Sequence, residues 1–171
     1  EDVDRIRDHF RPGASLVIVG AGYIGLEVAA VAVSHGLEVT VLEVADRVMA
    51  RVQAPVLSEF MDGVHRAAGV KIRCNTGLRA FAGETRLHGV VTSEGDEIRA
   101  DLAIIGIGIL PNSELAAEAG IACDNGILVD EYCRTADPDV LAIGDCTNHP
   151  NALLGRRLRL ESVHNAQEQA K

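Results

Sequence analysis

Three glycines near the start of the chain have the spacing to hold a dinucleotide. Gly20, Gly22 and Gly25 form a GxGxxG series within VIVGAGYIGLEVAA, residues 17–30. An apolar strand precedes the series and a helical pattern follows it, which is the context that this fingerprint requires. Gly20 permits a tight exit from the strand, Gly22 lets the backbone approach a pyrophosphate, and Gly25 lets the helix pack closely on the sheet. The N–H groups of the first helical turn would then face the phosphates.

An acidic residue, Glu43, ends the next apolar segment, LEVTVLE. A carboxylate at this position of the motif can accept hydrogen bonds from a ribose 2′-hydroxyl, and it would repel a 2′-phosphate. We therefore predict a site for NAD(H) that prefers NADH to NADPH. Arg47 and Arg51 follow in the next segment, and either could in principle meet a 2′-phosphate.

The composition argues against two classes of partner. The chain has 171 residues and a formal net charge of −9, and aromatic residues make up only 3% of it. A nucleic-acid surface needs clustered Lys and Arg, and a base-stacking platform needs aromatic rings. No apolar run approaches the length of a membrane span, and no signal-peptide pattern opens the chain. We expect neither a nucleic-acid partner nor a membrane.

The cysteines and histidines suggest neither a disulfide scaffold nor a metal site. Cys74, Cys123, Cys133 and Cys146 form no CxxC pair, and the six histidines lack metal-ligand spacing. Four reduced thiols are typical of a cytoplasmic protein, which is the location that we predict.

Alternating strand and helix patterns must position the glycine series and Glu43. A polar, helical lead-in covers residues 1–13, and the helix after the glycine series ends near Gly36, a left-handed stop. A second helix is expected over residues 54–68 and a strand over residues 70–74. The alternation predicts an α/β fold with a Rossmann-like parallel sheet and right-handed crossovers. The second helix is indicated by apolar residues three or four positions apart: Val56, Phe60, Val64 and Ala67.

The pattern then changes to short strands without helices between them. LRAFAG, LHGVVTSEG and DEIRA are separated by turn residues, which predicts an antiparallel β-meander. The apolar segment DLAIIGIG is expected to return to the parallel sheet. Gly106 and Gly108 lie at its carboxyl end, where ligands bind in such sheets and where glycine allows close backbone approach.

The last third of the chain reads as a further set of short elements. A helix is expected from Asn112 to its stop at Gly120. GILVDEY and DVLAIGD are strand-like, a polar loop follows, and RLRLES leads into a final helix, VHNAQEQAK.

Taken together, these segments resemble the FAD-dependent pyridine nucleotide-disulfide oxidoreductase superfamily, and most closely the ferredoxin reductases of bacterial oxygenase systems. The resemblance runs from about Gly13 to the end of the chain and rests on the order and spacing of five segments. They are VIVGAGYIGLEVAA, VTVLEVADRVMARV, AIIGIGILPNSELAAEAGI, GILVDEYCRTADPDVLAIGDC and RLRLESVHNAQEQAK.

The resemblance implies a domain organisation. Residues 14–108 would form the NAD(H)-binding domain, residues 109–125 a connection, and residues 126–171 an incomplete, returning part of an FAD-binding domain. The family's first GxGxxG, which holds the FAD pyrophosphate, and its C-terminal domain have no counterpart in these 171 residues. We therefore expect this chain to be part of a longer enzyme and to be inactive by itself.

The resemblance also assigns roles to single residues. Glu43 would bind the adenosine ribose with Arg51 near it, and Glu27 would lie beside the nicotinamide amide. Asp145 would hydrogen-bond the FAD ribityl chain, and Val163 would place backbone near the flavin pyrimidine ring. The remaining cofactor-binding residues would be Gly20, Gly22, Tyr23, Ile24 and Gly25 around the NADH pyrophosphate, with Gly106, Ile107 and Gly108 around the nicotinamide.

By resemblance, the parent enzyme would pass electrons from NADH through FAD to a small iron–sulfur protein of the ferredoxin or rubredoxin type. Hydride transfer demands no side-chain acid or base, so no catalytic residue is named. The alternatives are an NADH oxidase or peroxidase, a CoA or thiol disulfide reductase, or an NADH-sensing protein of the apoptosis-inducing-factor type. An incomplete flavin domain would leave apolar side chains uncovered, so a homodimer of this chain is a further expectation.

Overall fold

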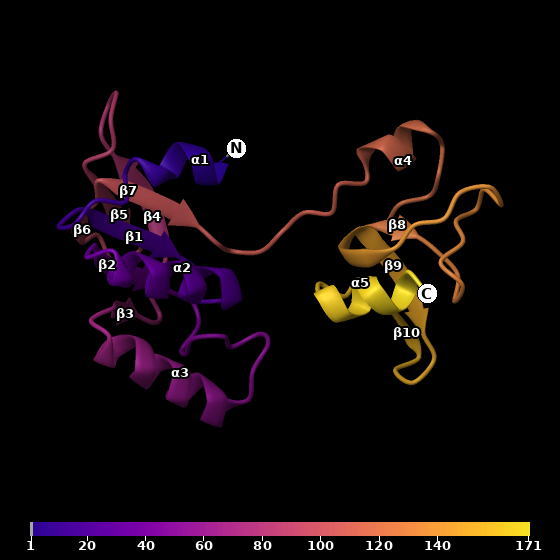
Figure 1. The fold of residues 1–171 in the computed structure, drawn as a ribbon, viewed down its shortest axis with the longest axis horizontal. Coiled ribbons are helices and arrows are strands. Elements are labelled where there is room, and N and C mark those ends of the chain that lie inside the picture. The colour runs from indigo at the N-terminus through magenta and orange to yellow at the C-terminus, as the bar shows by residue number, and fades with distance from the viewer. Residues whose placement is uncertain (1) are drawn as a thin grey trace. The chain divides into compact units, whose positions relative to one another are not determined.

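The chain folds into two compact units. The computed structural model describes residues 2–171 (Figure 1), and the first unit runs to Ile107 while the second comprises Gly108–Lys171. The expected connection, residues 109–125, thus lies within the second unit. None of the helices in the described part of the chain is long and apolar enough to cross a membrane.

A four-stranded parallel sheet forms the centre of the first unit, as the alternating pattern predicted. The strand order is β3-β2-β1-β7, and every neighbouring pair is parallel. The central strand β1 is buried along its whole length because strands pair with it on both sides. The strands are β1 (Ser15–Val19), β2 (Glu38–Leu42), β3 (Lys71–Arg73) and β7 (Leu102–Ile105).

The first unit has three helices: α1 (Asp2–Arg7), α2 (Tyr23–Ser34) and α3 (Pro55–Ala67). Helix α2 begins within the glycine series, directly after Gly22, buries Leu26, Ala29 and Ala32, and ends before Gly36, whose φ of 79° is left-handed. Its predicted start and stop are therefore confirmed.

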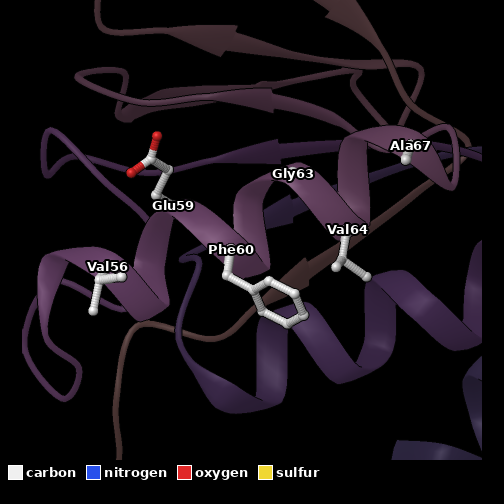
Figure 2. A pocket seen from close by; sticks show the side chains of 6 residues that line it. All are labelled: Val56, Glu59, Phe60, Gly63, Val64 and Ala67. Atoms are coloured by element: carbon white, nitrogen blue, oxygen red, sulfur yellow. The ribbon is translucent and has the colours of Figure 1, made fainter.

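Helix α3 was predicted, but its apolar stripe faces outward. Figure 2 shows Val56, Phe60 and Val64 along one side of the helix, and the exposed fraction of Phe60 is 64%. The helix instead contacts the unit through Ser58, Met61 and His65. The buried His65 ring has Nε2 3.1 Å from the Leu26 carbonyl oxygen on α2. Side-chain hydrogen bonding, and not apolar periodicity alone, thus sets how α3 is rotated.

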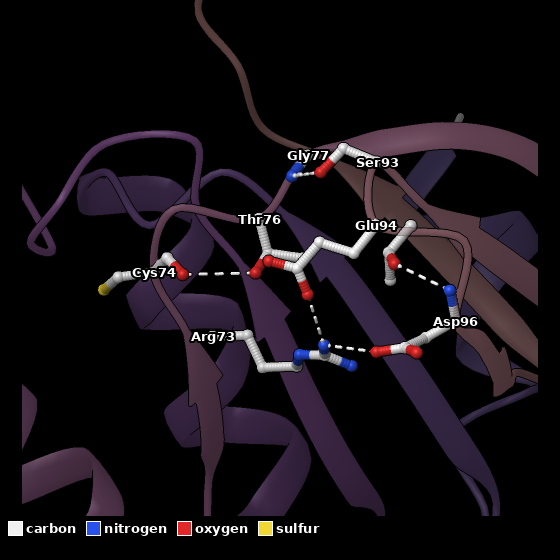
Figure 3. Close-up of polar contacts among 8 residues, drawn as sticks. Arg73, Cys74, Thr76, Gly77, Ser93, Glu94 and Asp96 are labelled. Carbon is white, nitrogen blue, oxygen red and sulfur yellow. Dashed lines mark hydrogen bonds and ion pairs between the residues drawn. The ribbon is translucent and has the colours of Figure 1, made fainter.

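The predicted antiparallel meander is present, with strand order β4-β5-β6. Its strands are β4 (Leu78–Ala82), β5 (Gly89–Thr92) and β6 (Glu97–Arg99). The Arg73 guanidinium at the end of β3 bonds Glu94 at 3.1 Å and Asp96 at 2.6 Å in the β5–β6 turn (Figure 3). These two ion pairs join the meander to the edge of the parallel sheet.

The second unit contains short elements around a three-stranded sheet of order β10-β9-β8. They are α4 (Glu114–Glu118), β8 (Ile127–Leu128), the 3₁₀ turn η1 (Gly144–Cys146), β9 (Thr147–Asn151), β10 (Arg156–Leu158) and α5 (Val163–Gln169). Helix α4 is shorter than the predicted helix over 112–120, and Gly120 follows its end with a φ of 78°.

Two strand predictions in this unit need correction. GILVDEY forms only the two-residue strand β8, because the Asp130 carboxylate accepts the backbone N–H groups of Tyr132 and Arg134 and turns the chain. DVLAIGD contains a single bridge, between Arg134 and Leu141, because β8 pairs with β9 instead. The segment predicted as a polar loop contains β9 and pairs with β10 as a hairpin.

Candidate functional site

The glycine series packs backbone against backbone with the end of β7. A Cβ atom on Gly20 would lie 2.3 Å from the carbonyl oxygen of Gly106, and one on Gly25 would lie 2.1 Å from the carbonyl oxygen of Gly20. Gly20 also has a φ of 102°, which favours glycine. Side chains at Gly20 and Gly25 are therefore excluded by close approach, and the structure brings Gly20, Gly25 and Gly106 together.

Gly22 has a different environment, open on the side where its Cβ would stand. Apart from the adjacent residues of the chain and the backbone of the helix itself, no heavy atom lies within 4 Å of that position. Gly22 is the N-cap residue of α2 and provides no side-chain acceptor for the helix. The N–H groups of the first helical turn also have no carbonyl acceptor within the helix. Tyr23 and Ile24 follow, with exposed fractions of 50% and 61%. An uncapped, open helix N-terminus suits an anionic pyrophosphate.

The Glu43 carboxylate lies against this turn. Its Oε2 accepts the backbone N–H of Ala21 at 2.7 Å, and its Oε1 accepts the N–H of Ala45 at 2.8 Å. A carboxylate offers about four lone-pair sites, so each oxygen can still accept a ribose hydroxyl. Ala21 is fully buried, and its carbonyl oxygen accepts the N–H of Met49 at 2.9 Å. Hydrogen bonds of Glu43 and of the segment after β2 with Ala21 thus stabilise the glycine-rich turn.

The two arginines of this segment have different surroundings. The Arg47 guanidinium donates to Ser58 Oγ at 2.6 Å and to the carbonyl oxygens of Gln53 and Ala50, each at 3.0 Å. Arg47 therefore joins the segment after β2 to α3, and its guanidinium makes its hydrogen bonds to other protein atoms. Arg51 is exposed. Of the two arginines, Arg51 has the accessibility that contact with a nucleotide requires.

The remaining predicted residues of the first unit lie around the same edge of the sheet. Glu27 is exposed on α2, one turn into the helix and two residues after Gly25. Gly106 follows β7 and donates its N–H to the Val19 carbonyl oxygen at 2.7 Å, and Ile107 is 67% exposed. Gly108 is the first residue of the second unit.

In the second unit, Asp145 occupies the middle of η1. Its side chain is exposed, and its backbone carbonyl oxygen accepts from Arg159 at 3.3 Å. Val163 begins α5, where the Ser162 hydroxyl caps the helix by accepting the N–H of Asn165. Helix α5 packs on η1, since a Cβ on Gly144 would lie 3.4 Å from the Ala166 Cβ. The exposed carboxylate and backbone of this unit suit a polar ligand such as a ribityl chain.

The thiols in the described residues are free, and burial raises the pKa of the Cys74 and Cys133 thiols. These two cysteines therefore favour the protonated form at neutral pH, in which a thiol is a poor nucleophile.

Comparison with known proteins defines the class. The family described as pyridine nucleotide-disulphide oxidoreductase matches residues 1–170, and this chain belongs to that family. Rhodocoxin reductase of Rhodococcus erythropolis is 50% identical over 92% of this chain and 37% of its own length. Putidaredoxin reductase of Pseudomonas putida is 45% identical over all of this chain and 41% of its own length. The chain thus spans about two fifths of the length of these curated relatives.

Solved structures agree with this assignment. A ferredoxin reductase from Rhodopseudomonas palustris superposes with a TM-score of 0.92 at 42% identity, over 98% of this chain and 42% of that one. The reductase in a covalent putidaredoxin reductase–putidaredoxin complex gives a TM-score of 0.92 at 45% identity, over 99% of this chain and 41% of that one. The predicted α/β fold and family resemblance are confirmed.

Proposed function

We propose that this chain binds NADH through its first unit and contributes to an FAD site through its second. It would act as part of a flavoprotein reductase that delivers electrons to a small iron–sulfur protein. The observation that carries the proposal is the open, uncapped N-terminus of α2 at Gly22, with the Glu43 carboxylate bonded to the same turn. An anion site and a ribose acceptor side by side are what a dinucleotide needs.

In the proposed NADH complex, the first-turn N–H groups of α2 hold the pyrophosphate while Glu43 accepts the adenosine ribose hydroxyls. The backbone at Gly106 and Ile107 flanks the nicotinamide, and Glu27 binds its amide. Arg51 lies beside the adenosine end. None of these residues exchanges a proton with the reacting carbon, because their work is to orient the nucleotide.

In the proposed flavin site, Asp145 accepts hydrogen bonds from the ribityl hydroxyls, and the backbone at Val163 lies near the pyrimidine ring. Bound FAD would supply the conversion between two-electron hydride chemistry and one-electron transfer. The residues of this chain would bind and orient, with no catalytic side chain among them.

The proposed electron acceptor is a ferredoxin or rubredoxin-type protein. Support comes from the names of the relatives, which include rubredoxin-NAD(+) reductase of Pseudomonas putida, 43% identical over 99% of this chain. A reducing, cytoplasmic setting for the four free thiols belongs to the same proposal. A homodimer of this chain is a separate proposal that rests on the exposure of Leu141 and Ile143, and light scattering that finds only monomer would contradict it.

The test uses the full-length reductase. We expect a visible flavin spectrum, reduction of that flavin by NADH, and NADH-dependent turnover of a ferredoxin or a rubredoxin. Peroxide or disulfide turnover in place of iron–sulfur reduction would move the protein to another branch of the family. A flavin-free, NADH-inert protein would contradict the proposal altogether.

A second measurement concerns this 171-residue chain alone. We expect it to lose FAD on dialysis, because one side of a cofactor site leaves most of the ligand surface in water. A stoichiometric flavin band after dialysis would show that the second unit holds FAD without further protein.

A further inference from the structure

We propose that Gln169 is a positioning residue of the flavin site, one that fixes the turn presenting Asp145. This inference rests on the proposed function. Gln169 is the last residue of α5, and it is 25 positions beyond Gly144 in the sequence. Its side chain reaches back to η1 and contacts both ends of that turn.

The contacts of the Gln169 carbonyl oxygen carry the inference. Oε1 accepts the backbone N–H of Gly144 at 2.7 Å and lies 3.2 Å from the hydroxyl oxygen of Thr147, whose one hydrogen has a shorter contact elsewhere. The first contact precedes Asp145 by one residue, and the second follows it by two. The Thr147 hydroxyl also lies 2.9 Å from the Gly144 carbonyl oxygen, which closes the turn.

The Gly144 N–H needs this external acceptor. Gly144 is buried, and Ile143, the N-cap residue of η1, provides no side-chain hydrogen bond. A buried backbone donor without a partner costs free energy, so the Gln169 oxygen replaces the missing cap. Gly144 also has a φ of 80°, which glycine adopts without strain, so the support from Gln169 lies in the N–H contact.

The orientation of the Gln169 amide is itself fixed. Its Nε2 lies 3.2 Å from Nδ1 of His149 on β9, so the nitrogen end is engaged and the oxygen end faces η1. The Asp145 carbonyl oxygen is held from the other side by Arg159, whose guanidinium also bonds Glu161 at 2.7 Å. The exposed Asp145 carboxylate therefore projects from a turn whose backbone is held on both sides.

The experiment compares three variants of the full-length reductase by titrating FAD into the apoprotein and following flavin fluorescence. Gln169→Met keeps the length of the side chain and removes the acceptor, Gln169→Glu keeps an acceptor oxygen, and Gln167→Met is an exposed control on the same helix. We expect Gln169→Met to weaken FAD binding roughly tenfold, as befits one lost hydrogen bond to a buried donor. Gln169→Glu should recover most of that affinity, and the control should match the wild type.

A merely structural role predicts another pattern. It would abolish the cooperative unfolding of the second unit together with FAD binding, whereas positioning of Asp145 weakens FAD binding in a unit that still unfolds cooperatively. Equal FAD affinity in Gln169→Met and Gln167→Met, or no recovery in Gln169→Glu, would overturn the inference. If Gln169→Met does not fold, Thr147→Val removes the hydroxyl that contacts the same oxygen. Weaker FAD binding in that variant supports the inference, and unchanged binding rejects it.

Failure of the proposed function gives a separate result. A wild-type protein that binds no FAD contradicts the flavin site as a whole. A wild-type protein that binds FAD, with Gln169→Met binding it equally well, contradicts only the role of Gln169.

Discussion

The carboxylate of Glu43 accepts the backbone N–H of Ala21 at 2.7 Å, which joins the acidic residue of the proposed nucleotide site to the glycine-rich turn. In the proposed NADH site, this contact would fix the ribose acceptor relative to the N–H groups that would hold the phosphates. Pre-organisation of this kind reduces the ordering cost of binding.

Replacing Glu43 with Ala should reduce the preference for NADH over NADPH by about tenfold. The substitution removes a charge-assisted ribose acceptor and the repulsion of a 2′-phosphate at once. The measurement is kcat/KM with each nucleotide on the full-length reductase. The isosteric Glu43→Gln is the companion variant, since it removes the charge and retains one acceptor. A wild-type enzyme without NADH preference would contradict the assignment of Glu43.

Alanine substitutions at Gly22 and Gly25 should affect different properties, NADH affinity in the first case and stability in the second. A Cβ at Gly25 would lie 2.1 Å from the Gly20 carbonyl oxygen, so Gly25→Ala should destabilise the first unit by about 1–3 kcal/mol. A Cβ at Gly22 would meet no other part of the chain within 4 Å, so Gly22→Ala should fold normally and bind NADH less tightly. Thermal unfolding and NADH titration of both variants test the pair. Tight NADH binding by Gly22→Ala would place the pyrophosphate elsewhere.

Substitutions at Arg47 and Arg51 should separate stability from binding. Arg47→Met removes the donors to Ser58 and two carbonyl oxygens, and we expect a loss of about 2 kcal/mol in unfolding free energy. Arg51→Met should leave stability unchanged and weaken NADH binding, most at low salt, where exposed charges are least screened. Denaturant unfolding and NADH affinity at two salt concentrations distinguish the roles. The reverse pattern would show that Arg47 meets the nucleotide.

At acidic pH, the free energy of unfolding of the first unit should depend on whether the Asp101 carboxyl is ionised. The Ser15 N–H donates to its carboxylate at 2.9 Å, which lowers the pKa of Asp101, and nearby Arg99 lowers it further. A carboxyl whose pKa is lower in the folded state stabilises that state above its unfolded pKa, about 4. The contribution disappears as the pH falls through the folded pKa.

Asp101→Asn should therefore flatten the pH dependence of unfolding free energy between about pH 5 and pH 2. Urea unfolding across that range provides the measurement, with Asp8→Asn, an exposed residue, as control. Parallel acid profiles for wild type and Asp101→Asn would show that the Ser15 contact contributes nothing to the acid response.

Much of the first unit could be predicted from local pattern. A strand, a glycine turn and a helix follow one another in the segment around Gly20, and each step depends on neighbouring residues. Glycine was required at Gly36 because the chain must turn there with a positive φ, which is a property of one residue. Turn residues between short runs likewise identified the meander. The roles assigned to single residues in cofactor binding remain predictions.

Tertiary structure alone decided how the elements are held and rotated. The apolar stripe of α3 faces outward, although its periodicity alone would have placed it inward. The hydrogen bonds from Arg47 to Ser58 and from Gly144 to Gln169 join segments that are distant in the sequence and follow no repeating pattern. The same holds for Ala21, whose contribution to the site is a backbone N–H that every residue except proline possesses. Local propensity and apolar periodicity report on neighbours along the chain, whereas a hydrogen bond between distant segments forms only once packing has brought its donor and acceptor together.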